Sequence, residues 1–286
     1  MATNAIVLSS NVNIDSVTFG EVKVNKQGGK GIALKYDNQS FQLRLPRMKF
    51  PGGLIQREDA SSGNISYSLI GSLKGCDPYA KERSTDDENG PLYNFLLDLQ
   101  DKVVGLATEN SAKWFGKKRS EESIRDSFKT MLSASTDKVE NEYVPNGKYP
   151  PSFRLKVPVY DGRVAMDVVD AKTMPYHLTV DSLRSVFPKY VEANLIVSGS
   201  IYIIGQSFGV TWRITFAQVF QPSRVTAATI FAKEEEVAAH QTEEHEHSAA
   251  DVEPPESHQQ SFQDIPQTAS SAPSMLLNSK KRRPAV

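Results

Sequence analysis

The chain has 286 residues and a formal charge of −1 at pH 7, with 39% hydrophobic and 23% charged residues. That composition supports one or two packed domains that need no disulfide bonds for stability. A single cysteine, Cys76, excludes an internal disulfide and a cysteine-based zinc site, so we expect a reducing, intracellular compartment. No run approaches the length of a membrane span and the N-terminus lacks a signal-peptide pattern, so we expect a soluble protein with no membrane partner.

The charge is distributed unevenly along the chain. From Lys233 onward ten acids oppose five bases, whereas residues 1–232 hold 28 bases and 24 acids. The whole-chain average therefore conceals a mildly basic body joined to an acidic segment. Residues 233–286 are rich in Glu, His, Pro, Ser and Gln and lack hydrophobic periodicity. We therefore predict a folded domain over 1–232 and a disordered acidic tail over 233–286.

The first 75 residues predict short strands separated by turns. Phe41, Leu43 and Leu45 alternate with Gln42 and Arg44, the period of a half-buried strand. The glycine-rich loop 28–31 lacks the spacing of a phosphate-binding loop and is expected to be a turn. The predicted strands of this part lie at 12–24, 32–36, 40–45 and 65–73.

The next segment changes to a helical period. Apolar residues from Leu92 to Leu106 fall at helical spacing after Pro91, which predicts a helix over 91–107. A second helix is predicted from Ser120 to about Leu132, with acids in its first turn and apolar residues on one face. Together these helices predict an insertion at about 91–134.

Strands return in the C-terminal part of the body. The alternation in 153–159 predicts a strand, Asp161-Gly162 predicts a tight hairpin, and a short helix is expected at 179–187. Two long strands follow at 191–204 and 208–220. The order of strands, helices and strands predicts a mainly β fold, an OB-fold-like antiparallel barrel or sandwich that carries the helical insertion.

The signals for catalysis are weak. Gly205 to Gly209 match the G-x-S-x-G pattern around Ser207, but a strand-like sequence follows where a nucleophile elbow needs a helix. His177 has no cysteine or histidine partner at ligand spacing. We therefore predict that the protein is not an enzyme and has no metal and no cofactor.

The basic residues form the stronger pattern. Arg44, Arg154, Lys156 and Arg213 occupy the outward positions of predicted strands whose other face is apolar. An irregular loop after the second of these strands adds Arg47 and Lys49. Cations on one outer face of a β-fold are typical of nucleic-acid binding.

Aromatic residues accompany these cations. Residues 113–119 surround Trp114 and Phe115 with four bases, Lys113, Lys117, Lys118 and Arg119. Two interpretations stay open: the rings stack on bases while the cations contact phosphates, or the rings fill the junction between the helices. Trp212 shares a face with apolar residues and is expected in the core, whereas Tyr202, on the side of Ser198 and Ser200, is the better exposed ring.

Three segments together carry a family resemblance: SFQLRLPRMKFPGGL, YPPSFRLKVPVYDG and SIYIIGQSFGVTWRITFAQVF. With these segments in the same order, over about residues 10–230, the chain resembles the single-stranded DNA-binding proteins of nucleocytoplasmic large DNA viruses. This group is distantly akin to the replication SSB of short-tailed coliphages. The resemblance implies an OB-fold with helices inserted between its third and fourth strands. It also implies sequence-independent binding and protection of single-stranded DNA in viral replication, recombination or repair.

The resemblance further implies that the acidic tail contacts a viral DNA polymerase or other replication proteins. The tail departs from the phage pattern because it ends in a basic cluster, Lys280, Lys281, Arg282 and Arg283. That cluster is either a nuclear-import signal or merely a basic tip, so we expect the host nucleus or a viral replication factory. The sequence leaves the oligomeric state open, with a homodimer as one alternative. The alternative function is a virion structural or assembly protein with a β-sandwich fold.

Overall fold

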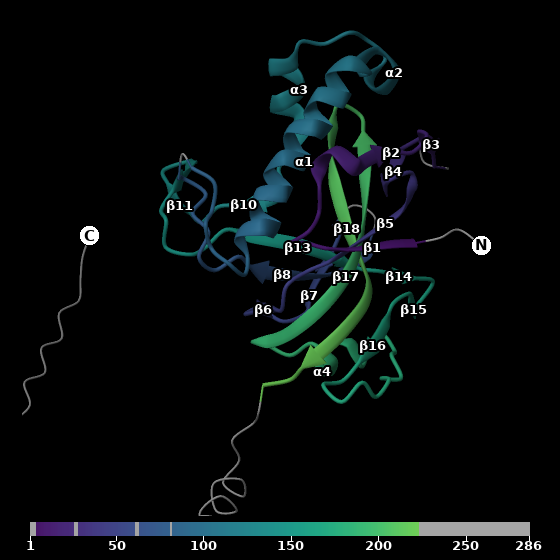
Figure 1. Ribbon diagram of the computed structural model, residues 1–286, viewed down its shortest axis with the longest axis vertical. Coiled ribbons are helices and arrows are strands. Elements are labelled where there is room, and N and C mark those ends of the chain that lie inside the picture. The colour runs from purple at the N-terminus through teal and green to yellow at the C-terminus, as the bar shows by residue number, and fades with distance from the viewer. Residues whose placement is uncertain (1–3, 26–27, 61–62, 81, 223–286) are drawn as a thin grey trace, which may run out of the picture. The chain divides into compact units, whose positions relative to one another are not determined.

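The computed structural model describes residues 4–25, 28–60, 63–80 and 82–222 (Figure 1). All of them belong to the first of two compact units, Met1–Arg224. The predicted tail at 233–286 and its basic cluster at 280–283 lie outside the described residues. Among the described helices, none is long and apolar enough to cross a membrane.

Strands dominate the N-terminal part, as the alternating sequence predicted. Residues 12–24, expected to be one strand, form a short 3-10 helix (Ile14–Ser16) and two short strands, because Asn13 caps that helix through a bond from the Asp15 amide. The strands are β1 (Asn4–Leu8), β2 (Val17–Phe19), β3 (Lys23–Val24), β4 (Lys30–Tyr36), β5 (Gln39–Arg44), β6 (Met48–Phe50), β7 (Ile55–Glu58) and β8 (Ile65–Ser72).

The insertion begins with the predicted long helix, α1 (Gly90–Glu109), followed by α2 (Ser111–Phe115) and α3 (Glu121–Ser127). The prediction of one helix to about residue 132 is wrong in its second half. After Ser127 the chain is extended, because residues 128–129 pair with a later strand and Phe128 packs on Phe208 at 5.2 Å between ring centroids. The strands that follow are β9 (Phe128–Lys129), β10 (Leu132–Ser133), β11 (Thr136–Val139) and β12 (Glu142–Pro145).

The C-terminal part confirms the predicted strands. Asp161 and Gly162 both have positive φ, +48° and +73°, as the predicted two-residue hairpin requires. The predicted helix at 179–187 is reduced to four residues. The elements are β13 (Ser152–Val157), β14 (Val159–Tyr160), β15 (Arg163–Val164), β16 (Asp167–Val169), α4 (Leu183–Val186), β17 (Val191–Ile204) and β18 (Ser207–Phe220).

Most strands join one sheet whose order is β1-β5-β4-β17-β18-β13-β8-β7. The predicted mainly β fold with a helical insertion is therefore confirmed. Two details differ from an antiparallel barrel. β1 pairs with β5, and β13 with β18, in parallel, because long connections separate these strands in the chain. Among the described residues no pairing joins β1 to β7, so hydrogen bonds do not close the sheet.

The core lies between the inner face of this sheet and α1. Trp212 of β18 is 1% exposed and packs edge-on against Phe41 and Phe153, with centroids 6.3 and 6.1 Å away. Phe41 also contacts Phe95 of α1 at 6.2 Å. The helical insertion thus covers the inner side of the sheet and leaves the outer side of the central strands turned away from it.

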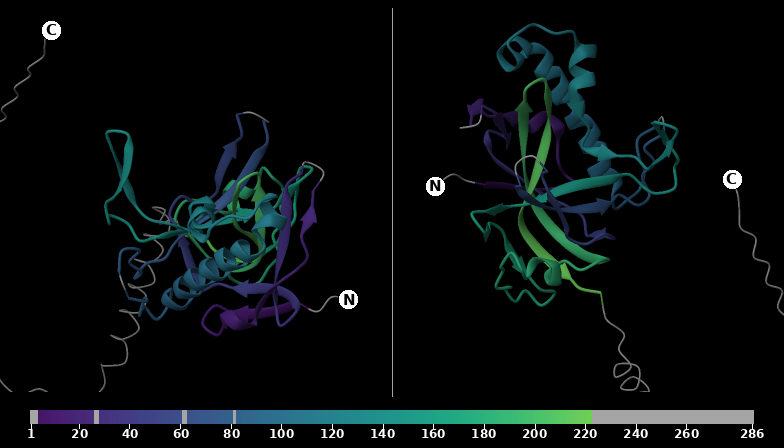
Figure 2. Two further views of the ribbon diagram at one scale, coloured as in Figure 1. Left: turned by 90° about the horizontal axis from the view of Figure 1, so that it is seen from above. Right: turned by 180° about the vertical axis from the view of Figure 1, so that it is seen from behind.

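Hairpins project from that outer side. Seen from above, the β3–β4, β7–β8 and β11–β12 hairpins extend in one direction, whereas α1 lies on the opposite side of the sheet (Figure 2). The β11–β12 pair forms a separate two-stranded sheet. The outer face of the central strands therefore lies at the foot of several projecting hairpins.

Gly199 offers a test of the core packing. A Cβ atom there would lie 2.5 Å from Leu34 Cδ1 and 3.0 Å from Trp212 Cζ3. We expect Gly199→Ala to lower the free energy of unfolding by about 1–3 kcal/mol through overpacking, measured by urea denaturation. The outward-facing neighbour variant Ser198→Ala is the control. Equal stability of the two variants would contradict the described packing of β4, β17 and β18.

Candidate nucleic-acid interface

The centre of the outer face is formed by side chains of β17 and β18 that alternate along the strands with buried residues. Tyr202 lies opposite Gly209, and the next outward pair toward the centre is Ser200 with Thr211. Ser198 follows, opposite the exposed Arg213. Because residues in register share a face, these side chains form one surface.

Neighbouring strands extend this surface on both sides. β13 places Lys156 in register with Arg213, and Lys156 also lies opposite Ser68 of β8. On the other side, Gly31 of β4 lies opposite Tyr202. Small and hydroxyl residues thus form much of the floor, which leaves the cations and the tyrosine ring accessible from outside.

Two adjoining hollows follow this surface. One, of about 320 Å³, is bounded by β8, β10, β13 and the β17–β18 ladder. The other, of about 300 Å³, lies beside the β3–β4 hairpin, and both are lined by Tyr202 and Thr211. We call the two together the outer groove. Its basic lining residues are Lys23, Lys30, Lys129, Arg154, Lys156 and Arg213, and no described aspartate or glutamate lines it.

Cations in and beside the outer groove repel one another. Burial, and then the charge of Arg213, lower the pKa of Lys156. Burial, and then the charge of Arg57 on β7, lower the pKa of Arg154. Within the described part of the chain, no ion pair with a carboxylate is formed by any of these four side chains, Arg57, Arg154, Lys156 and Arg213. The protein thus gathers positive charge here without neutralising it.

Tyr202 lies where the two hollows meet. Its ring is half-buried, and burial raises the pKa of its hydroxyl. A Cβ atom on Gly209 would come within 2.9 Å of the Tyr202 hydroxyl oxygen and 3.0 Å of the Lys129 carbonyl oxygen. The glycine therefore lets the neutral ring lie close against the sheet, with part of its surface open to the groove.

Lys30 connects the outer groove to the helical insertion. Its ammonium group donates hydrogen bonds to the backbone carbonyls of Trp114 and Lys113, at 2.8 and 3.1 Å. Those carbonyls belong to the last residues of α2, where a cation also interacts favourably with the helix dipole. The contact fixes the β3–β4 side of the groove against α2.

Three predicted cations do not line the outer groove. Arg44 is exposed on β5, in register with Ile196 of β17. Arg47 forms an ion pair with Glu192 at 2.9 Å and stacks over Phe220, with its guanidinium carbon 3.8 Å from the ring centroid. Lys49 lies in register with Glu192, at the far end of β17 from Tyr202.

The basic segment between the helices also lies outside the groove lining. Lys113, Lys117 and Lys118 are exposed, and none of them lines either hollow. Arg119 binds the protein instead: it donates to Ser127 Oγ at 2.6 Å and to the side chain of Gln206 at 3.3 Å. Arg119 therefore ties α3 to the β17–β18 turn.

Trp114 is a core residue, and the interpretation as a stacking ring is wrong for this structure. It is 3% exposed and packs edge-on against Phe115 and Phe208, with centroids 6.3 and 6.2 Å away. The alternative, that the rings fill the helical junction, describes the observed packing. Trp212 is buried as expected, and its indole N–H is directed at Met131 Sδ, 3.4 Å away.

The residues considered for other chemistry take structural positions. Ser207 begins β18 after a turn in which Gly205 has φ +58°, so a strand stands where a nucleophile elbow needs a helix. His177 lies beside Arg184 and Lys189 at a hollow next to α4. Among the described residues, no three histidine, cysteine, aspartate or glutamate side chains gather to hold a metal ion.

Sequence reasoning missed several residues of the outer groove. The sequence predicts Lys129 in a helix and Lys30 in a glycine-rich turn. Lys23 and Arg57 lie on short strands of adjacent hairpins and reach the cationic surface only through tertiary pairing. The alternation of β4 gives no signal for Lys30, because Lys30 has the same parity as the buried Ile32 and Leu34.

Comparisons with known proteins give distant structural likenesses only. No protein-family model and no curated protein matches the sequence. A single-stranded DNA-binding protein encoded by bacteriophage T7 aligns with 66% of this chain and 91% of its own, at 10% identity and a TM-score of 0.37. The single-stranded DNA-binding protein of bacteriophage Enc34, in complex with single-stranded DNA, aligns with 71% of this chain and 92% of its own, at 7% identity and 0.35.

The burial of Trp114 yields a direct test. We expect Trp114→Ala to lower the free energy of unfolding by about 3–5 kcal/mol, because it removes a large ring from a packed aromatic cluster. Urea denaturation measures this loss. Lys117→Ala, a nearby exposed residue, should leave stability unchanged. A fully stable Trp114→Ala protein would contradict the core assignment.

Proposed function

We propose that this chain binds single-stranded DNA without sequence preference through the outer groove. The observation that carries the proposal is the set of facing cations without carboxylate partners, Lys156 with Arg213 and Arg154 with Arg57. Burial, and then repulsion from the neighbouring cation, lowers the pKa of Lys156 and of Arg154 in the free protein. A bound polyanion would relieve this repulsion, since each phosphate favours the charged form of a nearby cation.

The lining of the groove favours a single strand over a duplex. Tyr202 exposes part of a flat ring between two groups of cations, and an unpaired base can stack on such a ring. In a duplex the base faces are already covered by neighbouring bases. Serine and threonine hydroxyls on the floor donate to any phosphate or sugar, so the contacts do not depend on one base.

The proposal extends to a biological role. The sequence resemblance supports protection of unwound DNA in viral replication, recombination or repair, as a member of the single-stranded DNA-binding proteins of nucleocytoplasmic large DNA viruses. The acidic composition of 233–286 supports contacts of that segment with a viral polymerase or other replication proteins. The host nucleus or a viral replication factory is the corresponding location. Binding of this kind involves no covalent step.

The central experiment removes the paired charges. We expect the double variant Lys156→Gln/Arg213→Gln to bind oligo(dT) more weakly. The slope of log K against log salt should flatten by about 1.4, since each lost phosphate contact contributes about 0.7 for single strands. Fluorescence titration at several salt concentrations measures both effects.

The matched control is Arg184→Gln/Lys189→Gln, which removes the same charge beside α4. An equal loss in both double variants would assign binding to net charge and contradict the groove. If the wild-type protein does not bind oligo(dT) in a native gel, that result would instead favour the alternative function, a virion structural protein.

The lowered pKa of Lys156 predicts a pH dependence of binding. Above that pKa the side chain loses its charge, so affinity for oligo(dT) should decline at a pH below the ordinary lysine value of 10.5. Tyr202 stays neutral in this range, because burial raises the pKa of its hydroxyl. In Lys156→Arg the decline should move to higher pH. Identical titration profiles of the two proteins would contradict the assignment.

A further inference from the structure

The β11–β12 hairpin is exposed along its strands, at residues 136–139 and 142–144. It is a two-stranded sheet of its own, residues 136–145, and we call it the arm. A two-stranded hairpin has little stability by itself in water. The arm therefore needs a firm attachment if it holds a defined position.

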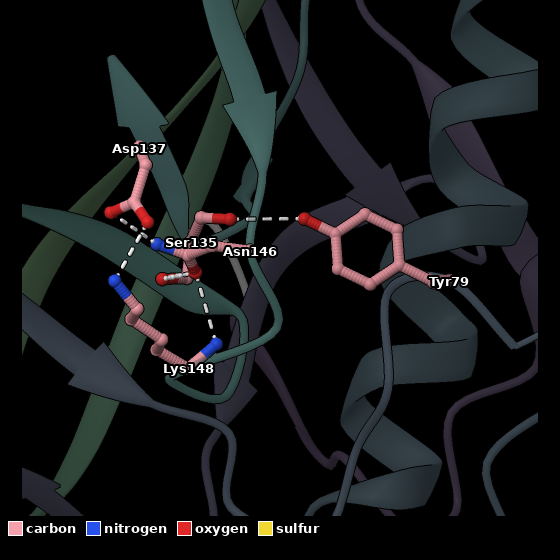
Figure 3. A network of polar contacts seen from close by, with 5 residues as sticks. All are labelled: Tyr79, Ser135, Asp137, Asn146 and Lys148. Atoms are coloured by element: carbon pink, nitrogen blue, oxygen red, sulfur yellow. Dashed lines mark hydrogen bonds and ion pairs between the residues drawn. The ribbon is translucent and has the colours of Figure 1, made fainter. Parts of the chain in front are cut away.

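A network of polar contacts supplies that attachment at the base of the arm (Figure 3). Asn146 accepts from Ser135 Oγ at 2.5 Å and donates to Asp137 Oδ1 at 2.8 Å. Lys148 Nζ contacts the other oxygen of Asp137 at 2.7 Å. Tyr79, from a distant loop, donates its hydroxyl hydrogen to the Ser135 carbonyl oxygen at 3.0 Å.

The charges in this network stabilise one another. The bonds from Lys148 and then Asn146 lower the pKa of Asp137, and the bond to Asp137 raises the pKa of Lys148. Both side chains therefore remain charged around neutral pH. The ion pair and the Asn146 amide join the two ends of the arm, and the Tyr79 bond attaches that base to a distant loop.

The two faces of the arm differ in chemistry. Lys138 and Tyr143 lie in register on one face, both exposed, and the Tyr143 side chain is 72% exposed. The opposite face carries Asp137, Glu142 and Val144. One face thus joins a cation to an open ring, whereas the other holds the carboxylates.

The arm adjoins the outer groove in the chain and in space. Ser133 of β10 lines the groove, and the arm begins three residues later. β10 is fixed in place by pairing with β13, the strand that supplies Lys156. Seen from above, the arm also projects on the side of the sheet away from α1 (Figure 2).

We propose that the Lys138–Tyr143 face of the arm is an additional nucleobase-stacking site for DNA that leaves the outer groove past Ser133. This inference rests on the proposed function and names a second part of the binding path. Tyr143 stacks on an unpaired base, and Lys138 contacts an adjoining phosphate. The fixed base of the arm reduces the ordering cost of that contact. The carboxylates of the opposite face repel phosphates, so that face lies outside the binding path.

The experiment compares two lengths of oligo(dT) on the full chain. An oligonucleotide of about 4 nucleotides can occupy the groove alone, whereas one of about 16 can also reach the arm. We expect Tyr143→Ala to weaken binding of the long oligonucleotide roughly tenfold and to leave the short one unchanged. Tyr143→Phe should retain wild-type affinity for both, because stacking needs the ring and not the hydroxyl.

Val144→Ala, on the opposite face, is the matched control for a disturbed arm. Equal weakening by Tyr143→Ala and Val144→Ala would overturn the stacking site, since it would reflect loss of the hairpin. Unchanged binding of the long oligonucleotide by Tyr143→Ala would also overturn the stacking site. This holds even if Lys156→Gln/Arg213→Gln weakens binding of both oligonucleotides. If that groove variant binds both lengths normally, the proposed function itself fails.

Discussion

The pairing of β17 with β18 is the constraint on which the rest of this structure depends. β17 also pairs with β4, β5 and β6, and β18 also pairs with β13, β16 and β9, so most of the sheet is aligned by two adjacent strands. Alternation in the central part of β18 sends Trp212 into the core and Arg213 to the outside. The same register that packs the interior therefore assembles the outer groove.

The distribution of ion pairs separates structural cations from those available to a ligand. Arg47 and Arg125 are paired with carboxylates, and Arg119 is bound by hydroxyl and amide oxygens. The outer groove instead brings Lys156 and Arg213 together without such partners. Leaving like charges adjacent opposes folding slightly, which is a typical compromise between stability and binding at functional sites.

The helical insertion supports the groove from behind. α1 fills the inner side of the sheet, and the end of α2 receives the Lys30 ammonium group through backbone carbonyls. The aromatic residues of the insertion stabilise the fold by packing around Phe208. The base of the arm is fixed by a comparable bond from Tyr79. Loops and helices far apart in the sequence thus hold the edges of one surface.

The sequence by itself determined the long strands, α1, the burial of Trp212 and the outward positions of Lys156, Arg213 and Tyr202, because these features depend on local periodicity. Only the tertiary structure decided that Trp114 is buried, since a ring beside lysines suits a surface or a helical junction equally well. Strand order likewise depends on contacts between distant segments. It decided which cations meet in one groove, which are neutralised by carboxylates, and that the sheet stays open between β1 and β7.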